Sequence, residues 1–329
     1  MTTIYISDPI HPDILTDIQA GADVHLGYGP NKVDYLSVSE TVDGVILRAE
    51  NFTREVIEAS PRLKIIARHG VGTNNVDIDA ATERRVWVTT TPGANSNAVA
   101  EHVFALLLTE ARKVCTAADR VRVGNWSESK ADLIGFELSG RTIGIIGFGA
   151  IGKRVAAIAK GFGMRILASD PVATSADASA SGADLVELDT LYDGADIITV
   201  HAPLLPGTRH MIGARELGMM KNTAVLINTS RGGLIDEDAL VAALTEGQIA
   251  GAALDVLEAE SIDMKDPLAH TRVPLSKVPN LILTPHIAGQ TQEAFLEAGT
   301  KSWLEVKAVL AGNAPSFPVN SDGLQKLAV

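Results

Sequence analysis

The stretch TIGIIGFGAIG, Thr142–Gly152, decides the fold of this 329-residue chain. Its first five residues predict a buried strand, and a Gly-x-Gly-x-x-Gly turn leads from them into a helical segment, Lys153–Lys160. In such a turn, the first glycine permits a tight bend, the second lets the backbone approach a pyrophosphate and the third lets helix and strand pack closely. Free N–H groups at the start of the helix attract an anion. The stretch therefore predicts a dinucleotide-binding unit.

A carboxylate follows at the expected distance. Asp170 lies 23 positions after Gly147 (170 − 147), at the end of the next predicted strand, 165–169. A carboxylate at this place accepts hydrogen bonds from the adenosine ribose hydroxyls and repels a 2′-phosphate. The same residue type also ends strands simply as a turn residue. Because no arginine stands among the next three residues, we expect NAD rather than NADP.

Short β-rich runs alternate with helical segments along the chain, the pattern of parallel sheets with crossover helices. Strands are expected at 3–7, 44–48, 64–68 and 86–89, and then at 142–146, 165–169, 197–200, 224–228, 251–256 and 281–284. The small-residue stretch 173–182 is expected to be a loop with a short turn. The final helix, 292–310, has no second-series sheet left to cover, so it is expected to return to the first series. The fold class is therefore α/β, with two doubly wound parallel-sheet domains: a Rossmann NAD-binding domain, 98–287, inserted into a flavodoxin-like substrate domain, 1–97 and 288–329.

Composition narrows the partners. A net charge of −12 argues against nucleic acid and acidic membrane surfaces. The single cysteine, Cys115, gives no disulfide framework, and no metal site is expected. The N-terminus lacks a secretion signal, and no apolar run reaches the ~18 residues that span a bilayer. A cytoplasmic protein is expected.

Three further segments follow predicted strands of the second series. They are NTSRGG (228–233), ALDVLEAE (253–260) and LTPHIAG (283–289). Because ligands bind beyond the carboxyl ends of parallel strands, we expect Arg231, Glu260 and His286 to converge there. A lone arginine is usually a surface ion pair and a lone histidine is usually structural, but neither explanation accounts for all three residues together.

With the glycine turn, these segments resemble the D-isomer-specific 2-hydroxyacid dehydrogenases, above all the phosphoglycerate and hydroxypyruvate (glycerate) branch. The resemblance runs along essentially the whole chain. It implies NAD-dependent hydride transfer between a small anionic 2-hydroxy acid and its 2-keto acid. Arg231 would hold the substrate carboxylate, His286 would act as general acid and base, and Glu260 would orient and stabilise the protonated imidazole. Asp255 would be a supporting carboxylate near the nicotinamide, although a buried turn carboxylate has the same sequence pattern.

The resemblance also implies the set of residues around the cofactor. They are Gly147, Gly149, Ala150, Ile151, Gly152, Asp170, His201, Ala202, Pro203, Thr208, Thr229, Ser230, Arg231, Asp255, His286 and Gly289. Glu260 is followed by Ser261, where the family commonly has proline, and the segment 261–279 is longer than usual.

The first domain offers an anion-binding turn. The segment Arg68-His69-Gly70-Val71-Gly72 follows a strand, and consecutive N–H groups of such a turn can bind a carboxylate, although an ordinary strand-to-helix turn has the same composition. Arg48 and Arg68 resemble arginines of the phosphoglycerate branch; they suit a second anionic group or a local ion pair. Candidate substrates are glycerate or hydroxypyruvate, 3-phosphoglycerate and sulfolactate, bound in a cleft between the domains. Asn95 and Ser96 are weaker substrate-binding candidates, since Ser96 and Asn97 are good helix caps, which is a sufficient structural reason for them.

Two functional alternatives remain. An NAD(H)-sensing regulatory protein of the same fold would bind cofactor without turnover. A formate dehydrogenase is disfavoured, since that branch carries glutamine where Glu260 stands. A homodimer is expected from Trp126 and from one long helix, 95–114, whose apolar surface exceeds what a single domain face needs; the residues concerned are Val99, Val103, Phe104, Leu106, Leu107 and Leu108.

Overall fold

The computed structural model describes residues 2–264 and 266–326, and it divides into two compact units. Unit 1 comprises Met1–Asn95 and Gln290–Val329, and unit 2 comprises Ser96–Gly289. The division falls at 95/96 and 289/290, against expected boundaries of 97/98 and 287/288. The end of the expected substrate domain, 327–329, lies outside the described residues.

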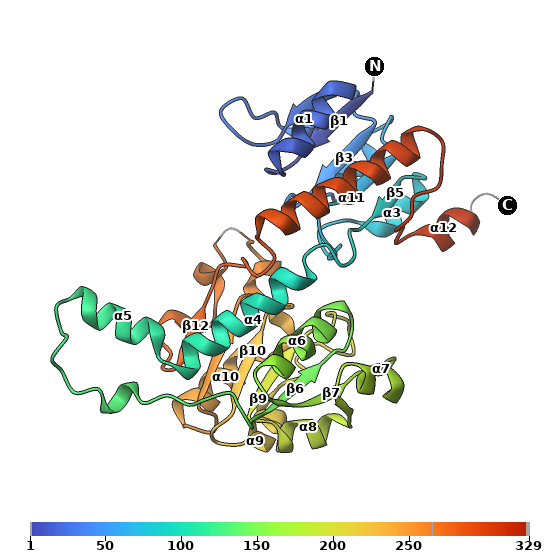
Figure 1. Cartoon of the computed structure of the whole chain (residues 1–329). Helices are drawn as coiled ribbons and strands as arrows, with labels where there is room; N and C mark the ends of the chain where they lie inside the picture. Colours follow the sequence, from blue (N-terminus) through green and yellow to red (C-terminus); the bar gives the residue numbers. More distant parts are fainter. Residues whose placement is uncertain (1, 265, 327–329) are drawn as a thin grey trace. The chain divides into compact units, whose positions relative to one another are not determined.

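Unit 1 is built on a five-stranded parallel sheet with the order β2-β1-β3-β4-β5 (Figure 1). Its strands are β1 (Thr3–Ile6), β2 (Asp23–Leu26), β3 (Gly44–Leu47), β4 (Ile65–Arg68) and β5 (Trp87–Thr89). This is the flavodoxin-like order that the sequence predicted. The edge strand β2 was missed because its residues are only partly buried and make no apolar run.

Helices cover this sheet and close its core. They are α1 (Pro12–Gly21), α2 (Arg54–Glu58), α3 (Ile78–Glu83), α11 (Gln292–Leu310) and α12 (Ser321–Lys326). As predicted, α11 returns from the far end of the chain to this sheet, where Trp303 and Val306 pack with Ile4 and Ile65. Each such buried apolar side chain contributes about 1.5–3 kcal/mol.

Unit 2 is built on a seven-stranded parallel sheet with the order β12-β11-β10-β9-β6-β7-β8. Its strands are β6 (Thr142–Ile146), β7 (Arg165–Ser169), β8 (Asp184–Leu185), β9 (Ile197–Val200), β10 (Val225–Asn228), β11 (Gly251–Leu254) and β12 (Leu281–Leu283). Counted from β6, the order is 3-2-1-4-5-6 with a seventh strand added, which is the Rossmann arrangement. The sequence predicted six of these strands and missed β8, which is too short to give a pattern.

The crossover helices of unit 2 are α6 (Ala150–Gly161), α7 (Ser175–Ala180), α8 (Leu188–Gly194), α9 (Ala214–Met219) and α10 (Glu237–Thr245). The expected loop at 173–182 was wrong, because it contains α7. Thr174 and Asp177 form a capping box at its start, and Ala178 is fully buried, so capping and packing overcome the weak local signal. The long segment between β11 and β12 contains the 3-10 turns 258–261, 267–270 and 275–277.

The single long helix expected over 95–114 is two helices, α4 (Ser96–Ala111) and α5 (Val114–Arg122). Lys113 adopts a left-handed backbone conformation, with φ 50°, which ends α4 and changes the chain direction. The apolar side chains of α4 are not surplus: Val103, Phe104 and Leu107 are buried in the core of unit 2. The helix therefore gives no support to the expected homodimer.

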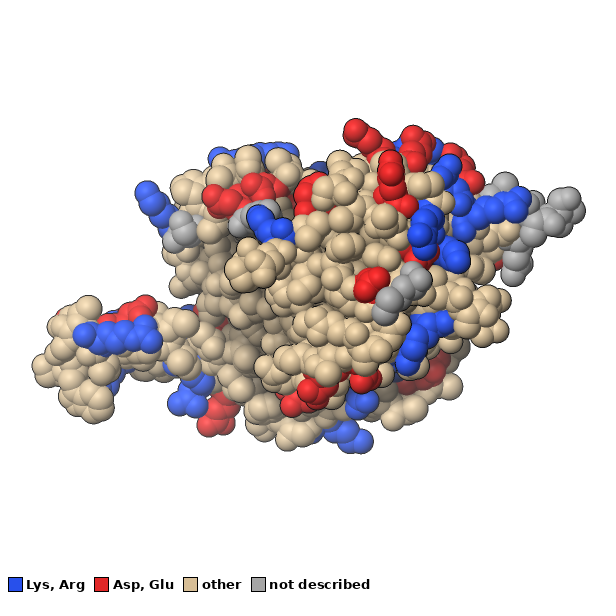
Figure 2. Space-filling model, turned by 90° about the horizontal axis from the view of Figure 1, so that it is seen from above, with Lys and Arg blue, Asp and Glu red and all other residues tan. Residues whose placement is uncertain are grey.

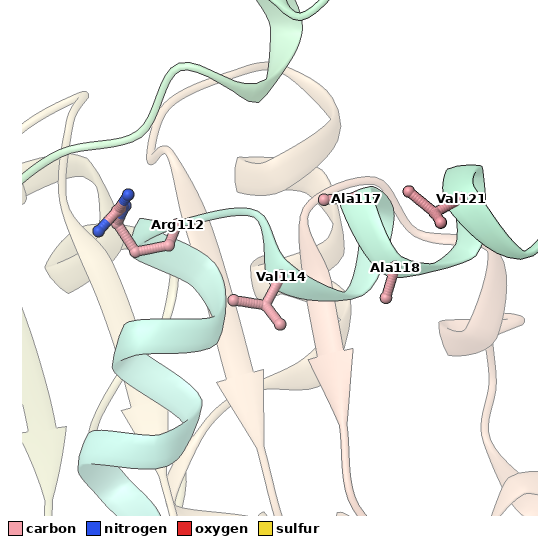
Figure 3. Close-up of a pocket in the computed structure, with 5 residues that line it drawn as sticks. All are labelled: Arg112, Val114, Ala117, Ala118 and Val121. Atoms are coloured by element: carbon pink, nitrogen blue, oxygen red, sulfur yellow. The ribbon is translucent and has the colours of Figure 1, made fainter. Parts of the chain in front are cut away.

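The segment after α4 is the part of unit 2 with the most exposed apolar side chains. No side chain of α5 is buried, and Val123, Trp126 and Ile134 are each more than 70% exposed. Figure 2 shows this segment as the projection at the left. A shallow pocket is lined by Arg112 and by apolar residues of α5, which are Val114, Ala117, Ala118 and Val121 (Figure 3).

None of the helices in the described part of the chain combines the length and the apolar character that a membrane crossing needs.

Candidate active site

The glycine turn after β6 has the geometry of a dinucleotide cradle. Helix α6 begins at Ala150 behind Gly149, and no side chain caps its first turn, so its N–H groups are available to an anion. A Cβ atom at residue 152 would lie 2.3 Å from the carbonyl oxygen of Gly147, so only glycine lets the helix pack this closely. The predicted cradle residues of this turn, Gly147 to Gly152, fit a pyrophosphate.

Asp170 stands at the end of β7 beside this turn and holds it in shape. Its Oδ2 accepts the N–H of Phe148 at 2.7 Å, and its Oδ1 accepts those of Val172 and Ala173 at 2.8 and 2.9 Å. Burial alone would raise the pKa of Asp170, but these three hydrogen bonds together lower it. The residue is therefore an ionised, partly exposed carboxylate, which fits contact with ribose hydroxyls.

Other residues expected around the cofactor follow β9 and β10. Burial lowers the pKa of His201 to about 3, which keeps its imidazole neutral. Within the described residues, His201 Nδ1 and Thr229 Oγ1 are buried without a hydrogen-bond partner, and a bound ligand could satisfy such groups. Thr208 instead bonds its own loop, donating to the carbonyl of Pro203 at 2.7 Å. Ser230 donates to the carbonyl of Val200 at 2.6 Å.

The turn that carries Arg231 is fixed from both sides. Asn228, at the end of β10, accepts the Ser230 N–H at 3.0 Å and donates to the Arg231 carbonyl at 2.8 Å. A Cβ atom at residue 232 would lie 1.9 Å from the carbonyl carbon of Leu257, so glycine alone lets this turn pack against the loop that carries Glu260. Burial lowers the pKa of Arg231, and the neighbouring Glu260 opposes that effect. The guanidinium remains charged.

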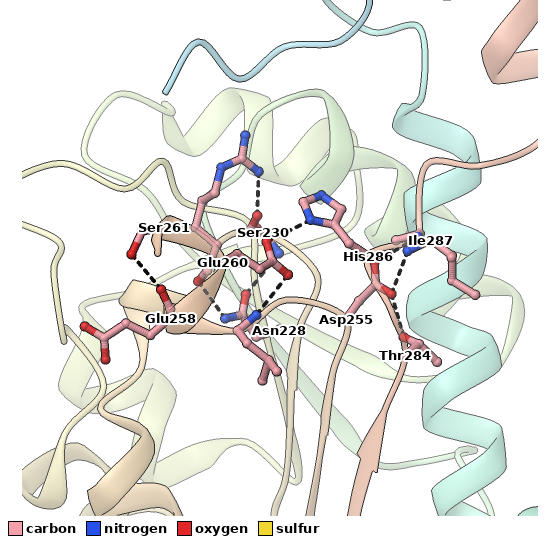
Figure 4. A network of polar contacts seen from close by, with 12 residues as sticks. Asn228, Ser230, Asp255, Glu258, Glu260, Ser261, Thr284, His286 and Ile287 are labelled. Atoms are coloured by element: carbon pink, nitrogen blue, oxygen red, sulfur yellow. Dashed lines mark hydrogen bonds and ion pairs between the residues drawn. The ribbon is translucent and has the colours of Figure 1, made fainter. Parts of the chain in front are cut away.

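Glu260 and His286 form a direct pair (Figure 4). His286 Nδ1 lies 2.9 Å from Glu260 Oε2, while Glu260 Oε1 accepts the N–H of Leu257 at 3.1 Å. The Glu260 side chain is 11% exposed and that of His286 is 42% exposed. Since Nδ1 is engaged by the carboxylate, Glu260 fixes the orientation of the imidazole ring. Structure thus brings Arg231, Glu260 and His286 together at one sheet edge, as the sequence predicted.

Asp255 lies at the centre of a hydrogen-bond network around His286. It is 1% exposed, and its carboxylate accepts hydrogen bonds from Thr284 and from the N–H groups of Ile287 and Ala288, at 2.5, 2.9 and 2.8 Å. Its carbonyl oxygen accepts the His286 N–H at 2.9 Å. Through these bonds, Asp255 holds the loop around His286 in place. That loop needs holding, since His286 is left-handed, with φ 54°.

Unit 1 gathers its own charged group at the ends of β3 and β4. Arg68 donates from Nε to the carbonyl of Gly72 and from Nη1 to that of Leu47, both at 2.7 Å, and also to that of Arg48. These bonds tie the glycine turn to the strand ends. Arg68 therefore has a structural role at this turn, and its contact with substrate stays a prediction.

Arg48 is placed differently. Its guanidinium lies 4.6 Å from the ring centroid of Phe295, and among the described residues no carboxylate lies within 4 Å of it. Burial lowers the pKa of Arg48, and the charge of Asp8 opposes that effect. A largely desolvated cation without a close counter-ion favours an anionic ligand.

His69 and the glycine turn adjoin this arginine. His69 meets the edge of the Phe295 ring, its pKa is lowered to about 4 by burial and by Arg48, and its Nε2 has no partner among the described residues. Gly70 is held by a hydrogen bond from the Thr91 N–H to its carbonyl at 3.0 Å, and Val71 is half exposed. Of the weaker candidates, Asn95 ends the first segment of unit 1, and Ser96 is buried at the start of α4.

Two residues near His286 were missed by sequence reasoning. Thr284 was read only as part of a segment, and His102 was read as part of a helix. His102 Nε2 lies 3.2 Å from Thr284 Oγ1, although the two residues are 182 positions apart. The pattern of α4 gave no sign of this contact, because a single histidine on a helix has no characteristic spacing.

Comparisons with known proteins agree with this geometry. Residues 104–288 match the family described as D-isomer specific 2-hydroxyacid dehydrogenase, NAD binding domain. The chain is 40% identical over 322 residues to a D-3-phosphoglycerate dehydrogenase of Methanocaldococcus jannaschii, covering 97% of this chain and 60% of that protein. It is 41% identical over 285 residues to a glyoxylate reductase of Thermococcus litoralis, covering 85% and 84%.

A solved structure, the D-lactate dehydrogenase of Aquifex aeolicus complexed with NAD and lactic acid, superposes with a TM-score of 0.82. It is 29% identical and covers 97% of this chain and 99% of its own. The chain spans about 60% of the length of the phosphoglycerate dehydrogenase that it matches. On these matches and on the site geometry, the chain belongs to the D-isomer specific 2-hydroxyacid dehydrogenase family, whose NAD-binding domain it contains.

Proposed function

We propose that the chain catalyses the NAD-dependent interconversion of a small anionic 2-hydroxy acid and its 2-keto acid. The observation that carries the proposal is the 2.9 Å pair of His286 and Glu260, in one network with Arg231 at the carboxyl edge of the NAD-binding sheet. A histidine oriented by a carboxylate is suited to hold and release a proton near neutral pH.

The residues divide the work as follows. NADH, when bound, supplies the hydride that adds to the keto carbon. Arg231 binds the substrate carboxylate through its planar fork and keeps the reacting carbon in place. His286 gives the proton on Nε2 to the carbonyl oxygen as that oxygen gains the electron pair, which yields the hydroxy acid. Glu260 stabilises the imidazolium before transfer and keeps the ring oriented.

For the substrate, we infer a compound with a second anionic group, such as a phosphate or a sulfonate. Arg48 supports this inference, because its guanidinium is largely buried and no carboxylate of the described chain lies within 4 Å. A second anion would offset the cost of burying that charge. The N–H groups of the Gly70–Gly72 turn would add neutral donors.

Turnover measurements test both the proposed reaction and the proposed substrate class. The native protein is given NADH with glyoxylate, pyruvate, hydroxypyruvate, 3-phosphohydroxypyruvate and sulfopyruvate, and NADH loss is followed by absorbance. We expect kcat/KM to be highest for a keto acid with a second anion. Binding of NADH with no turnover of any of these acids would favour a sensor over an enzyme. A preference for glyoxylate would contradict the inference that the substrate has a second anionic group, but not the proposed reaction.

Cofactor preference follows from Asp170. Replacing Asp170 with serine removes an acceptor for the ribose and the charge that repels a 2′-phosphate. The preference for NADH over NADPH in kcat/KM should narrow by about tenfold or more. Asp177→Ser, at an exposed carboxylate of the same surface, is the matched control and should leave the preference unchanged.

We also propose that the chain forms a homodimer through the segment 114–134. The exposed apolar residues of this segment, rather than α4, now support that proposal. Sedimentation should give twice the mass of one chain at micromolar concentration. Replacing both Val121 and Trp126 with aspartate should halve that mass, and a native mass of one chain would overturn the proposal.

A further inference from the structure

We propose that His102, on α4, is a positioning residue for His286 and acts through Thr284 and Asp255. This inference rests on the proposed dehydrogenase function, but its structural part can be tested without any turnover. Three contacts carry it: His102 Nε2 to Thr284 Oγ1 at 3.2 Å, Thr284 Oγ1 to Asp255 Oδ1 at 2.5 Å, and Asp255 to the backbone of residues 286–288.

Chemistry fixes the direction of the hydrogen bonds. An ionised carboxylate only accepts, so the single hydroxyl proton of Thr284 points to Asp255. The hydroxyl oxygen of Thr284 can then only accept from His102, which must carry its proton on Nε2. Donation into the hydroxyl oxygen polarises the O–H bond and strengthens the bond that it makes to the carboxylate.

These hydrogen bonds lead from His102 to the backbone segment that carries the proposed general acid, His286. Asp255 accepts the N–H groups of His286, Ile287 and Ala288, which fixes three consecutive peptides (Figure 4). His286 is held there with φ 54°, a conformation that costs a non-glycine residue free energy unless its surroundings enforce it. Glu260 orients the imidazole ring of His286 by contacting it directly, and Asp255 orients it by holding the backbone of residues 286–288.

The burial of Asp255 explains why the contact with His102 matters. The Asp255 side chain is fully buried, and among the described residues the only basic side chain within 4 Å is His102, at 3.6 Å from Oδ1. Without His102, the oxygen of the partly buried Thr284 would lose its donor, and the hydroxyl would be free to turn away. A helix packed on β10 and β11 is a rigid mount for such a partner.

The decisive experiment compares two substitutions of His102. The amide nitrogen of glutamine can occupy the place of His102 Nε2, whereas leucine keeps the volume and removes the donor. We expect His102→Leu to lower kcat by about tenfold with little change in the KM for NADH, and His102→Gln to restore most of it. Glu101→Gln, at an exposed neighbouring position of α4, is the control and should keep native kcat. Equal losses in the glutamine and leucine variants would overturn the proposal.

A double-mutant cycle tests the route. Thr284→Val removes the hydroxyl but keeps the shape, so in that background His102→Leu should have no further effect on kcat. Thr284→Ser should keep the coupling. Additive losses from the two substitutions would show that His102 does not act through Thr284.

Amide hydrogen exchange separates this inference from the proposed function. Exchange at Ile287 and Ala288 should speed up by about tenfold or more in His102→Leu, and not in His102→Gln or Glu101→Gln. A native protein that turns over no keto acid would overturn the proposed function, while these exchange rates would still decide the structural claim. Unchanged protection of the Ile287 and Ala288 amides in His102→Leu would overturn the claim that His102 holds this backbone segment.

Discussion

Both units place charged residues at the carboxyl ends of parallel strands, but they arrange them in opposite ways. In unit 2, His286 meets the carboxylate of Glu260 at 2.9 Å, with the cation of Arg231 in the same network. In unit 1, Arg68 is bound to backbone carbonyls, and no carboxylate of the described chain lies within 4 Å of Arg48. A site that pairs a base with an acid can hold and move a proton, whereas two arginines at strand ends are suited to bind an anion.

This contrast predicts where substitutions should act: on kcat in unit 2, and on KM and substrate choice in unit 1.

The largest effect is expected at His286. His286→Asn keeps a polar side chain but cannot transfer a proton, so kcat for keto-acid reduction should fall by about 10²–10⁴. The dissociation constant of NADH, measured by fluorescence, should change little. A kcat within tenfold of native would show that the proton comes from another group.

Next in size is the change at Glu260. Glu260→Gln keeps the shape of the side chain but removes the charge beside the imidazole, so reduction should be lost at a lower pH than in the native protein. Oxidation of the hydroxy acid, which needs the free base, should begin at lower pH. The rates of reduction and of oxidation are measured across pH for the native protein and for Glu260→Gln. If the pH profiles of the two proteins superimpose, Glu260 has only a structural role.

A smaller and more selective effect is expected at Arg48. Arg48→Met should raise the KM for a substrate with a second anion by about 10–100-fold, because a hydrogen bond to a charged group is lost. It should leave kcat, and the KM for glyoxylate, nearly unchanged. Arg48→Lys keeps the charge, so its KM for a substrate with a second anion should lie between those of the native protein and Arg48→Met. An equal rise for glyoxylate would show that Arg48 does not distinguish the substrates.

The smallest effect concerns stability, and it is absent at neutral pH. Burial and Arg48 lower the pKa of His69 from 6.5 to about 4, so between these values the unfolded chain binds a proton that the folded chain does not. Stability should therefore fall as pH drops from about 6.5 toward 4. His69→Gln should flatten this part of the profile, measured as the urea midpoint at pH 7 and pH 4.5. An equal drop in both proteins would contradict the assignment.

His201 in unit 2 offers the matching test, because burial lowers its pKa to about 3 and extends the same dependence to lower pH.

Much of this molecule was determined by the sequence alone. The glycine turn at 147–152, with Asp170 behind it, predicts a nucleotide-binding unit, because those residue types at that spacing satisfy a local requirement of turn and helix geometry. Arg231, Glu260 and His286 could be grouped without coordinates, since each follows a strand of one parallel sheet. Failures of the strand predictions fell where burial is slight, as at β2 and β8.

What only the tertiary structure decided is the partner of each charged group. Asp255, Arg68 and Arg48 all looked like ligand-binding residues. In the structure, Asp255 accepts hydrogen bonds from Thr284 and from the backbone of the His286 loop, and Arg68 donates to the carbonyls of Gly72 and Leu47. Lys113 broke a helix whose pattern looked continuous, and α4 buried apolar residues that had suggested an interface. His102 meets Thr284 across 182 positions. Periodicity and motif spacing record which face a residue occupies, whereas a hydrogen-bond partner depends on where distant segments are brought by packing.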